Sequence, residues 1–479
     1  MAAGSGAVRA ETSWIERQFK VRAAGSTVGT EIRGGVTNYL VMSYILVVNA
    51  VILSQAGVPF VACVAATALL AALFTGGMAF FANYPYAGAA GLGINAVVAF
   101  TLVKSLGLSW QGAMGVVALE GLAILILMAL GVRRALLDAV PMPLKLAIGA
   151  GIGAFIFAIG FFNGGLAVGT GNPADPVALG NLNSGTAIVT LGGLALTAFL
   201  YARGVKGALI LGIIGATILS ILVNSATGGA TYKDLPGVAV IPAADKLIGI
   251  PDFSTIGAIF GSGPNGLYFV EVFRLGVFVA ILTIFSLMLS DFFDTAGTVT
   301  SVASQGCWLK PNGTIDRADR VFWVDSAGAF LGGVFGTSSN TTYIESGAGV
   351  AEGARTGLAS LVTAALFLLS IFLATIAGVV PPQATAGVLM LVGWFMFRPI
   401  LDLNKIGNID FATGFAVLLT VFVMPLTYSI TNGIGAGFVA YVLLKLASGK
   451  MADVSRPMLI AAIAFAIYFA DPWLRQFVK

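Results

Sequence analysis

The sequence contains no histidine and only two cysteines, Cys63 and Cys307. Without histidine the chain cannot build a Ser–His–Asp triad or a histidine-ligated metal site. The two cysteines lie far apart in the chain and argue against a disulfide framework. We therefore expect no enzymatic activity, no metal and no organic cofactor.

Charged residues are also scarce, at 10% of 479 residues, whereas 58% are hydrophobic and the mean hydropathy is +0.96. Such a composition is far from that of soluble proteins and is typical of a helical protein that crosses the membrane several times. The net charge of +4 is spread over the predicted loops. We interpret it as a determinant of membrane topology and expect the lipid bilayer, not nucleic acid, as a partner.

Apolar runs that are long enough to cross a bilayer predict fourteen spans. They cover residues 35–54, 60–82, 88–104, 112–131, 143–162, 185–202, 206–224, 272–298, 322–335, 338–354, 357–379, 384–398, 411–428 and 431–447. A further run, 457–470, is either a fifteenth crossing or an interfacial helix.

Basic residues follow most of the even-numbered spans, whereas the intervening loops 163–185, 379–383 and 427–433 carry none. Short cytoplasmic loops are richer in Lys and Arg than the loops on the other side. The pattern therefore predicts a multi-pass protein with a cytoplasmic N-terminus. The small loops and the absence of a targeting signal favour a bacterial inner membrane.

The stretch from Gly336 to Gly349, GTSSNTTYIESGAG, is unusually polar for a membrane segment. A carboxylate such as Glu345 costs roughly 2.5 to 3.5 kcal/mol at bilayer depth, so it usually faces a cavity or a partner. Residues 337–343 have β-strand character, and a helix can begin near Glu345. Candidates for its N-cap are Asn340, Thr341 and Thr342. The stretch predicts a broken span that lines a ligand site, with a polar loop between two helices as the alternative.

A second interrupted stretch, YPYAGAAGLGIN from Tyr84 to Asn95, lies in the third predicted span. It is entered by proline, is rich in glycine and precedes its polar counterpart by seven spans. An odd number of crossings inverts the second half relative to the first, and paired interruptions in such repeats indicate a binding site. The alternative is that these glycines only permit close helix packing.

The eighth predicted span ends in a polar stripe. Asp291, Asp294, Thr295 and Thr298 follow one another at helical spacing on one face. Two acids within one turn repel each other when both are ionised, and a carboxyl that changes protonation in a cavity can carry a coupled proton. The alternative is an ordinary solvated helix end in the headgroup region.

Other acids carry less information. We interpret Glu120, within the fourth span, as a helix-packing partner, and we assign Asp316, Asp319 and Asp325 to a charged loop and its edge.

Five segments together resemble a known family. They are YPYAGAAGLGIN (84–95), SDFFDTAGT (290–298), GTSSNTTYIESGAG (336–349), RTGL (355–358) and MPLTYSI (424–430). They are similar to the motifs of AzgA-like purine permeases, the adenine, guanine and hypoxanthine branch of the nucleobase-ascorbate transporter superfamily. The resemblance runs in order from about Thr30 to Lys450.

This resemblance implies an all-α polytopic fold like that of the bacterial uracil permease, with fourteen spans in two inverted repeats of seven and short strands in the broken spans 3 and 10. It implies a cytoplasmic segment at 1–34, a core domain formed by 35–142 and 272–383, and a gate domain formed by 143–271 and 384–479. Whether the protein forms a homodimer through the gate domain stays open.

The resemblance also implies proton-coupled uptake of a purine base. If the roles of the family's residues are assigned to the matching positions of this sequence, Glu345 would hydrogen-bond the base. Asp291 or Asp294 would bind base or proton, and Asn95 would support the site. Thr341 and Thr342 complete the expected substrate site, and Asp291, Asp294 and Glu345 are the candidates for proton coupling. The absence of histidine argues against uracil as the preferred substrate.

Two other classes remain as alternatives. An anion carrier or channel of the same broad fold would need a basic residue at the site, and an intramembrane enzyme would need a nucleophile with a base or a metal set.

Overall fold

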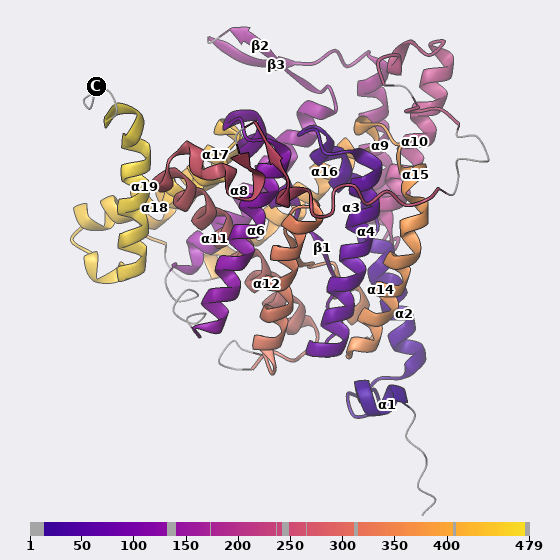
Figure 1. Cartoon of the computed structure of the whole chain (residues 1–479), viewed down its shortest axis with the longest axis horizontal. Helices are drawn as coiled ribbons and strands as arrows, with labels where there is room; N and C mark the ends of the chain where they lie inside the picture. The colour runs from indigo at the N-terminus through magenta and orange to yellow at the C-terminus, as the bar shows by residue number, and fades with distance from the viewer. Residues whose placement is uncertain are drawn as a thin grey trace, which may run out of the picture.

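The structure is a computed structural model, and it describes residues 14–131, 140–172, 174–235, 237–241, 249–264, 266–310, 315–405 and 409–474. In these ranges the chain forms a bundle of helices (Figure 1). Ten of the described helices are long and apolar enough to cross a bilayer. The prediction of a helical polytopic membrane protein is confirmed.

The first part of the bundle contains α1 (Trp14–Phe19), α2 (Val28–Met42), α3 (Ile45–Ser54), α4 (Phe60–Gly77), η1 (Met78–Ala82), β1 (Gly88–Ala90), α5 (Leu92–Ala96), η2 (Val97–Ser105) and α6 (Trp110–Ala129). It is followed by α8 (Met142–Asn163), the hairpin β2 (Ala167–Asn172) and β3 (Asp175–Leu179), α9 (Gly185–Ala202) and α10 (Ala208–Ala226). In Figure 1 the hairpin projects from one end of the bundle, and α1 lies at the opposite end.

Short elements connect α10 to the second part of the bundle. They are η3 (Ala230–Tyr232), η5 (Ala258–Phe260), β4 (Ser262–Gly263), β5 (Gly266–Leu267) and η6 (Tyr268–Leu275). The second part contains α11 (Val277–Gln305), α12 (Ala318–Phe335), β6 (Asn340–Thr342), α13 (Ser346–Ala351), α14 (Gly357–Ser370), η7 (Ile371–Leu373), α15 (Ala374–Ala377), α16 (Pro382–Phe397), η8 (Arg398–Lys405), α17 (Phe411–Thr427), α18 (Ile430–Ala447), η9 (Met451–Asp453) and α19 (Arg456–Leu474).

Local sequence explains where several of these helices begin and how closely they pack. The Ser109 side chain accepts a hydrogen bond from Gly112 N and so caps α6. A Cβ on Gly121 would overlap the backbone of Phe330, so glycine lets α6 approach α12 closely. The run 457–470 forms α19, which packs against α18 with the Phe465 and Phe438 rings 6.0 Å apart.

The two interrupted stretches meet in the interior as a short antiparallel sheet. β1 pairs with β6, with Gly88 opposite Thr342 and Ala90 opposite Asn340. Gly91 N also donates to Ser339 O (2.7 Å). The expected short strands in the third and tenth predicted spans are therefore present, and each strand is followed by a helix, α5 or α13.

This strand pairing corrects one prediction. Asn340, Thr341 and Thr342 do not cap a helix, because their backbones pair with β1. The helix begins later, at Ser346, and no side chain caps it. Glycine is required at Gly88 in the partner strand, because a Cβ there would overlap the Phe74 ring and lie 2.5 Å from Thr341 O.

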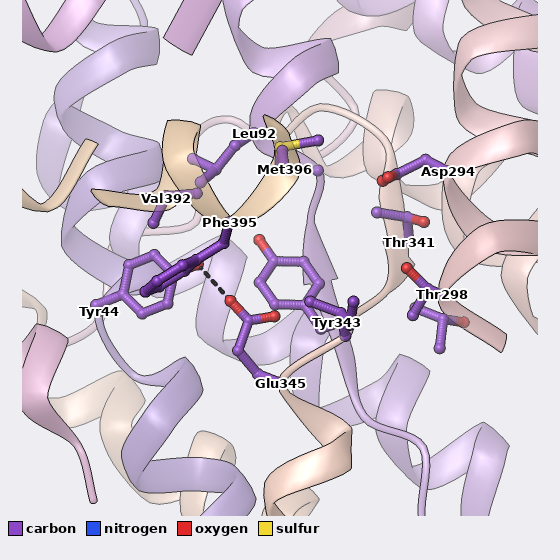
Figure 2. A pocket seen from close by; sticks show the side chains of 13 residues that line it. Tyr44, Leu92, Asp294, Thr298, Thr341, Tyr343, Glu345, Val392, Phe395 and Met396 are labelled. Atoms are coloured by element: carbon purple, nitrogen blue, oxygen red, sulfur yellow. Dashed lines mark hydrogen bonds between the residues drawn. The ribbon is translucent and has the colours of Figure 1, made fainter. Parts of the chain in front are cut away.

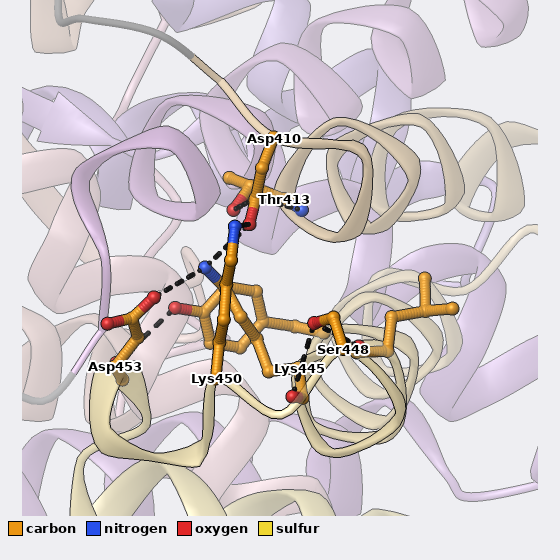
Figure 3. A network of polar contacts seen from close by, with 8 residues as sticks. Asp410, Thr413, Lys445, Ser448, Lys450 and Asp453 are labelled. Carbon is orange, nitrogen blue, oxygen red and sulfur yellow. Dashed lines mark hydrogen bonds and ion pairs between the residues drawn. The ribbon is translucent and has the colours of Figure 1, made fainter.

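A network of ion pairs joins α17, α18 and η9 (Figure 3). The buried Lys445 amine pairs with Asp410 (2.9 Å) and Asp453 (2.8 Å), and Lys450 also reaches Asp410 (3.2 Å). Asp410 is the N-cap of α17 and accepts from Thr413 N. Hydrogen bonds from Thr413 and Lys445 hold the pKa of the Asp410 carboxyl well below its usual range.

Candidate functional site

A small cavity of about 60 Å³ lies beside the paired strands (Figure 2). One wall is polar and comes from α11, β6 and the residues after β6. The opposite wall is apolar and comes from α16. The lining residues are Tyr44, Gly91, Leu92, Asp294, Thr298, Thr341, Thr342, Tyr343, Ile344, Glu345, Val392, Phe395 and Met396.

Glu345, the predicted substrate-binding carboxylate, lines the cavity and is held by Tyr44. The Tyr44 hydroxyl donates to Glu345 Oε1 at 2.9 Å, and Figure 2 shows the two side chains meeting below Phe395. Tyr44 lies between α2 and α3, where the first membrane helix is interrupted, and it is 1% exposed. Sequence reasoning missed Tyr44, because a tyrosine in an apolar span carries no motif of its own.

The polar stripe of α11 divides between two environments. Asp294 and Thr298 line the cavity. Asp291 lies behind it, 1% exposed, and accepts a hydrogen bond from the Ser339 hydroxyl (2.9 Å). The sequence could not distinguish the two aspartates, and the structure gives only Asp294 a place at the cavity wall.

Thr341 and Thr342 also line the cavity, and a buried carboxylate supports them from behind. Asp325 Oδ1 accepts from both the backbone N (2.9 Å) and the hydroxyl (2.8 Å) of Thr342, and Asp325 Oδ2 accepts from the Thr295 hydroxyl (2.7 Å). The Thr295 and Thr341 hydroxyls are 2.8 Å apart. Asp325 therefore anchors β6 to α11 and α12.

The assignment of Asp325 to the edge of a charged loop was wrong. It lies two turns inside α12 and is only 3% exposed. Three hydrogen bonds compensate the burial of its carboxyl group. Those partners come from distant parts of the chain, so the local sequence could not reveal them.

Asn95 does not line the cavity. It is fully buried in α5, and neither side-chain polar atom has a hydrogen-bond partner among the described residues. It follows the cavity residues Gly91 and Leu92 by about one helical turn.

The electrostatics of the cavity are those of a cation or a hydrogen-bond donor site. Its lining includes two carboxylates and no lysine or arginine. In the part of the chain that the structure describes, no group of three or more acids and cysteines is arranged to hold a metal ion. The carboxylates of Glu345 and Asp294 can therefore accept hydrogen bonds from a ligand, and the rings of Tyr44, Tyr343 and Phe395 also line the cavity.

Comparisons with known proteins identify the family to which this chain belongs. Residues 29–435 match the xanthine/uracil permeases, described as "Permease family". The adenine permease AdeP of Escherichia coli (strain K12) is 35% identical over 453 residues, covering 95% of this chain and 95% of AdeP. The guanine/hypoxanthine permease PbuG of Bacillus subtilis (strain 168) is 35% identical over 460 residues, covering 94% of this chain and 98% of PbuG.

A solved structure shares the fold at much lower identity. The transmembrane domain of the cyanobacterial bicarbonate transporter BicA superposes with a TM-score of 0.57 at 16% identity, covering 85% of this chain and 96% of that one. This similarity concerns the fold alone. The relatives that match over nearly the whole chain are permeases, not enzymes, and the chain belongs to the xanthine/uracil permease family, in its AzgA-like branch.

Proposed function

We propose that this protein takes up purine nucleobases, namely adenine, guanine and hypoxanthine, together with protons. The observation that carries the proposal is the cavity beside the paired strands, whose lining combines the carboxyls of Glu345 and Asp294 with aromatic side chains. The relatives support it, because their names include adenine permease and guanine/hypoxanthine permease.

The chemistry of the cavity suits a purine. A purine presents ring N–H donors, which carboxylates accept, and ring nitrogens or a carbonyl, which N–H groups can reach. Glu345 and Asp294 are the proposed acceptors, and the hydroxyls of Thr341 and Thr342 complete the polar wall. A site that pairs every polar edge of its ligand discriminates strongly against analogues that lack one.

Proton coupling is proposed for Asp291, Asp294 and Glu345. Asp291 and Asp294 are one helical turn apart on α11, and the cluster receives no ion pair from a basic side chain among the described residues. Carboxyls placed in this way bind and release protons as the site opens and closes. Asn95 supports the arrangement from behind the cavity.

The proposed architecture has fourteen spans in two inverted repeats of seven, with a core domain at 35–142 and 272–383 and a gate domain at 143–271 and 384–479. Packing supports this division. Helices α6 and α12 pack together, as do α4 and α14, whereas α16 packs on α8 and α9, and α17 packs on α18. The polar wall of the cavity would then belong to the core domain and its α16 wall to the gate domain.

Relative movement of these domains would expose the cavity alternately to the two sides of the membrane. We further propose a bacterial inner membrane location, a cytoplasmic N-terminus and a homodimer through the gate domain.

The alternative function is that of an anion carrier, because a bicarbonate transporter has a similar fold. The two carboxylates at the cavity argue against it, because they would repel an anion.

Purified protein in liposomes tests the proposed function directly. Hypoxanthine should accumulate when the outside is made acidic and should only equilibrate when no proton gradient is imposed. Equal uptake with and without the gradient would contradict proton coupling. Bicarbonate or chloride currents without purine uptake would favour the anion carrier.

A further inference from the structure

Five residues of the cavity lining carry a hydroxyl group, and their hydrogen bonds show which hydroxyl is available to a ligand. Each hydroxyl has a single proton to donate. The five residues are Tyr44, Thr298, Thr341, Thr342 and Tyr343. A hydroxyl whose proton is already donated to a protein oxygen cannot also donate to a ligand in this conformation.

Both tyrosine hydroxyls donate within the protein. The Tyr44 hydroxyl donates to Glu345 Oε1 (2.9 Å). The Tyr343 hydroxyl donates to the Ala90 carbonyl oxygen of β1. Neither tyrosine therefore has a proton left for a ligand.

The hydroxyl protons of the two β6 threonines are also engaged. Thr342 donates to Asp325 Oδ1 (2.8 Å), and Thr295 donates to Asp325 Oδ2 (2.7 Å). The Thr341 hydroxyl lies 2.8 Å from that of Thr295. Because Thr295 gives its only proton to Asp325, the proton in the contact between Thr295 and Thr341 comes from Thr341.

Thr298 of α11 is the exception. It is 7% exposed and lines the cavity, and its hydroxyl has no hydrogen-bond partner among the described residues. A threonine within a helix can donate to the carbonyl four residues before it. Thr283 donates in this way to Val279 O, and Thr300 to Ala296 O, both at 2.8 Å and both in the same helix as Thr298. Thr298 is thus the one hydroxyl of the lining whose proton is available to a ligand.

The free hydroxyl has a carboxylate as its neighbour. Asp294 lies one helical turn before Thr298 on α11, and both residues line the cavity. Figure 2 shows the two side chains on one side of the cavity, with Glu345 and Tyr44 across from them. Side chains four positions apart on a helix have Cβ atoms about 5 to 6 Å apart. Because a carboxylate only accepts hydrogen bonds, the pair offers a ligand an acceptor next to a donor.

Hypoxanthine and guanine have the complementary edge, in which a ring N–H lies next to the carbonyl oxygen at C6. We propose that Thr298 contacts the substrate and determines specificity, donating to the C6 carbonyl oxygen while Asp294 accepts from the neighbouring ring N–H. An amino group at C6, as in adenine, would instead donate to the oxygen of the same hydroxyl. This inference rests on the proposed purine uptake and deepens it, because it states which group of the base the site recognises.

The test compares hypoxanthine with unsubstituted purine, which carries only hydrogen at C6. The assay is initial uptake of labelled hypoxanthine, at matched amounts of protein in the membrane, in cells that lack their own purine uptake. It gives the KM for hypoxanthine and, by competition, the Ki of unlabelled purine. Thr298→Val replaces the hydroxyl by a methyl group of similar size. It should raise the KM by about twofold to tenfold, as expected for one lost hydrogen bond, and leave the Ki of purine unchanged.

The ratio of the two constants distinguishes recognition from a general structural defect, which would change both constants together. Thr298→Ser keeps the hydroxyl and should keep the wild-type ratio. Thr300→Val is the matched control, because it makes the same change on the same helix at an exposed residue whose hydroxyl donates to Ala296 O. It should leave both constants unchanged.

Thr298→Val with the wild-type ratio overturns the proposal. So does Thr298→Ser with the ratio of Thr298→Val, because the methyl group and not the hydroxyl would then matter. If thermal unfolding in detergent shows that Thr298→Val does not fold, Thr298→Ala removes the same hydroxyl and should show the same change in ratio. If wild type takes up no purine, the proposed function fails and this inference fails with it. If wild type takes up hypoxanthine and removal of the hydroxyl leaves the ratio unchanged, only this inference fails.

Discussion

The hydrogen bond between Tyr44 and Glu345 makes a quantitative prediction. Tyr44→Phe removes the hydroxyl that donates to Glu345 Oε1 at 2.9 Å and leaves the ring in place in the cavity lining. Hydrogen bonds to charged groups contribute about 1.5 to 3 kcal/mol. If Tyr44 fixes the orientation in which Glu345 accepts from the base, losing the bond raises the KM for purine uptake by about 10-fold to 150-fold.

The assay is initial uptake of labelled hypoxanthine over a range of concentrations, at matched amounts of protein in the membrane. Tyr343→Phe is the control. It removes a hydroxyl from a second cavity tyrosine, whose partner is the Ala90 carbonyl of β1 and not Glu345. Tyr343→Phe should lower the thermal stability of the protein more than it changes the KM for purine uptake. A Tyr44→Phe variant with an unchanged KM would refute the argument that Tyr44 positions Glu345.

Three further predictions concern the surroundings of the cavity. Asp325→Asn should abolish most purine uptake, measured in cells at equal expression, because an amide cannot accept all the hydrogen bonds that anchor β6; uptake at the wild-type level would contradict this role. Gly88→Ala should lower the thermal unfolding temperature and uptake together, because its Cβ would overlap the Phe74 ring; an unchanged melting profile would show that the strands can separate. Asp410→Asn should be less stable than wild type at neutral pH. Because the pKa of Asp410 is lowered in the folded state, its stabilisation is present above about pH 4 and is lost as the pH falls through the folded pKa, so thermal unfolding of the two proteins should converge in acid and not diverge.

Much of the fold was predictable from the sequence, because patterns of neighbouring residues determine where its helices and strands form. Apolar runs gave the helices, and the two interrupted stretches at 84–95 and 336–349 gave the strands that pair as β1 and β6. The start of α13 at Ser346 agrees with the prediction of a helix from about Glu345 onward, but its predicted N-cap was wrong. The residues proposed as its N-cap satisfy their backbone groups by pairing with a strand some 250 positions away, which no local signal reveals.

The candidate site was predictable to the extent that its residues were out of place in a membrane. Glu345, Asp294, Thr341 and Thr342 stand out as polar residues in apolar surroundings, and the structure brings them to one cavity. Asp325 and Tyr44 were missed. Their roles depend on hydrogen-bond partners elsewhere in the fold. Asp325 accepts a hydrogen bond from Thr342, and Tyr44 donates one to Glu345.

The separation of Asp291 from Asp294 likewise needed the structure. Both lie on one helical stripe, and only the position of Ser339 shows that one of them is turned away from the cavity.

The most direct test of the account is uptake of radiolabelled adenine, guanine, hypoxanthine and uracil by wild type and by Glu345→Gln, in cells that lack their own purine uptake. We predict saturable uptake of at least one purine, little uptake of uracil, and loss of purine uptake in the variant at equal membrane expression. Purine uptake that is unchanged in Glu345→Gln would contradict the placement of the site, and no uptake of any base by wild type would contradict the proposed function.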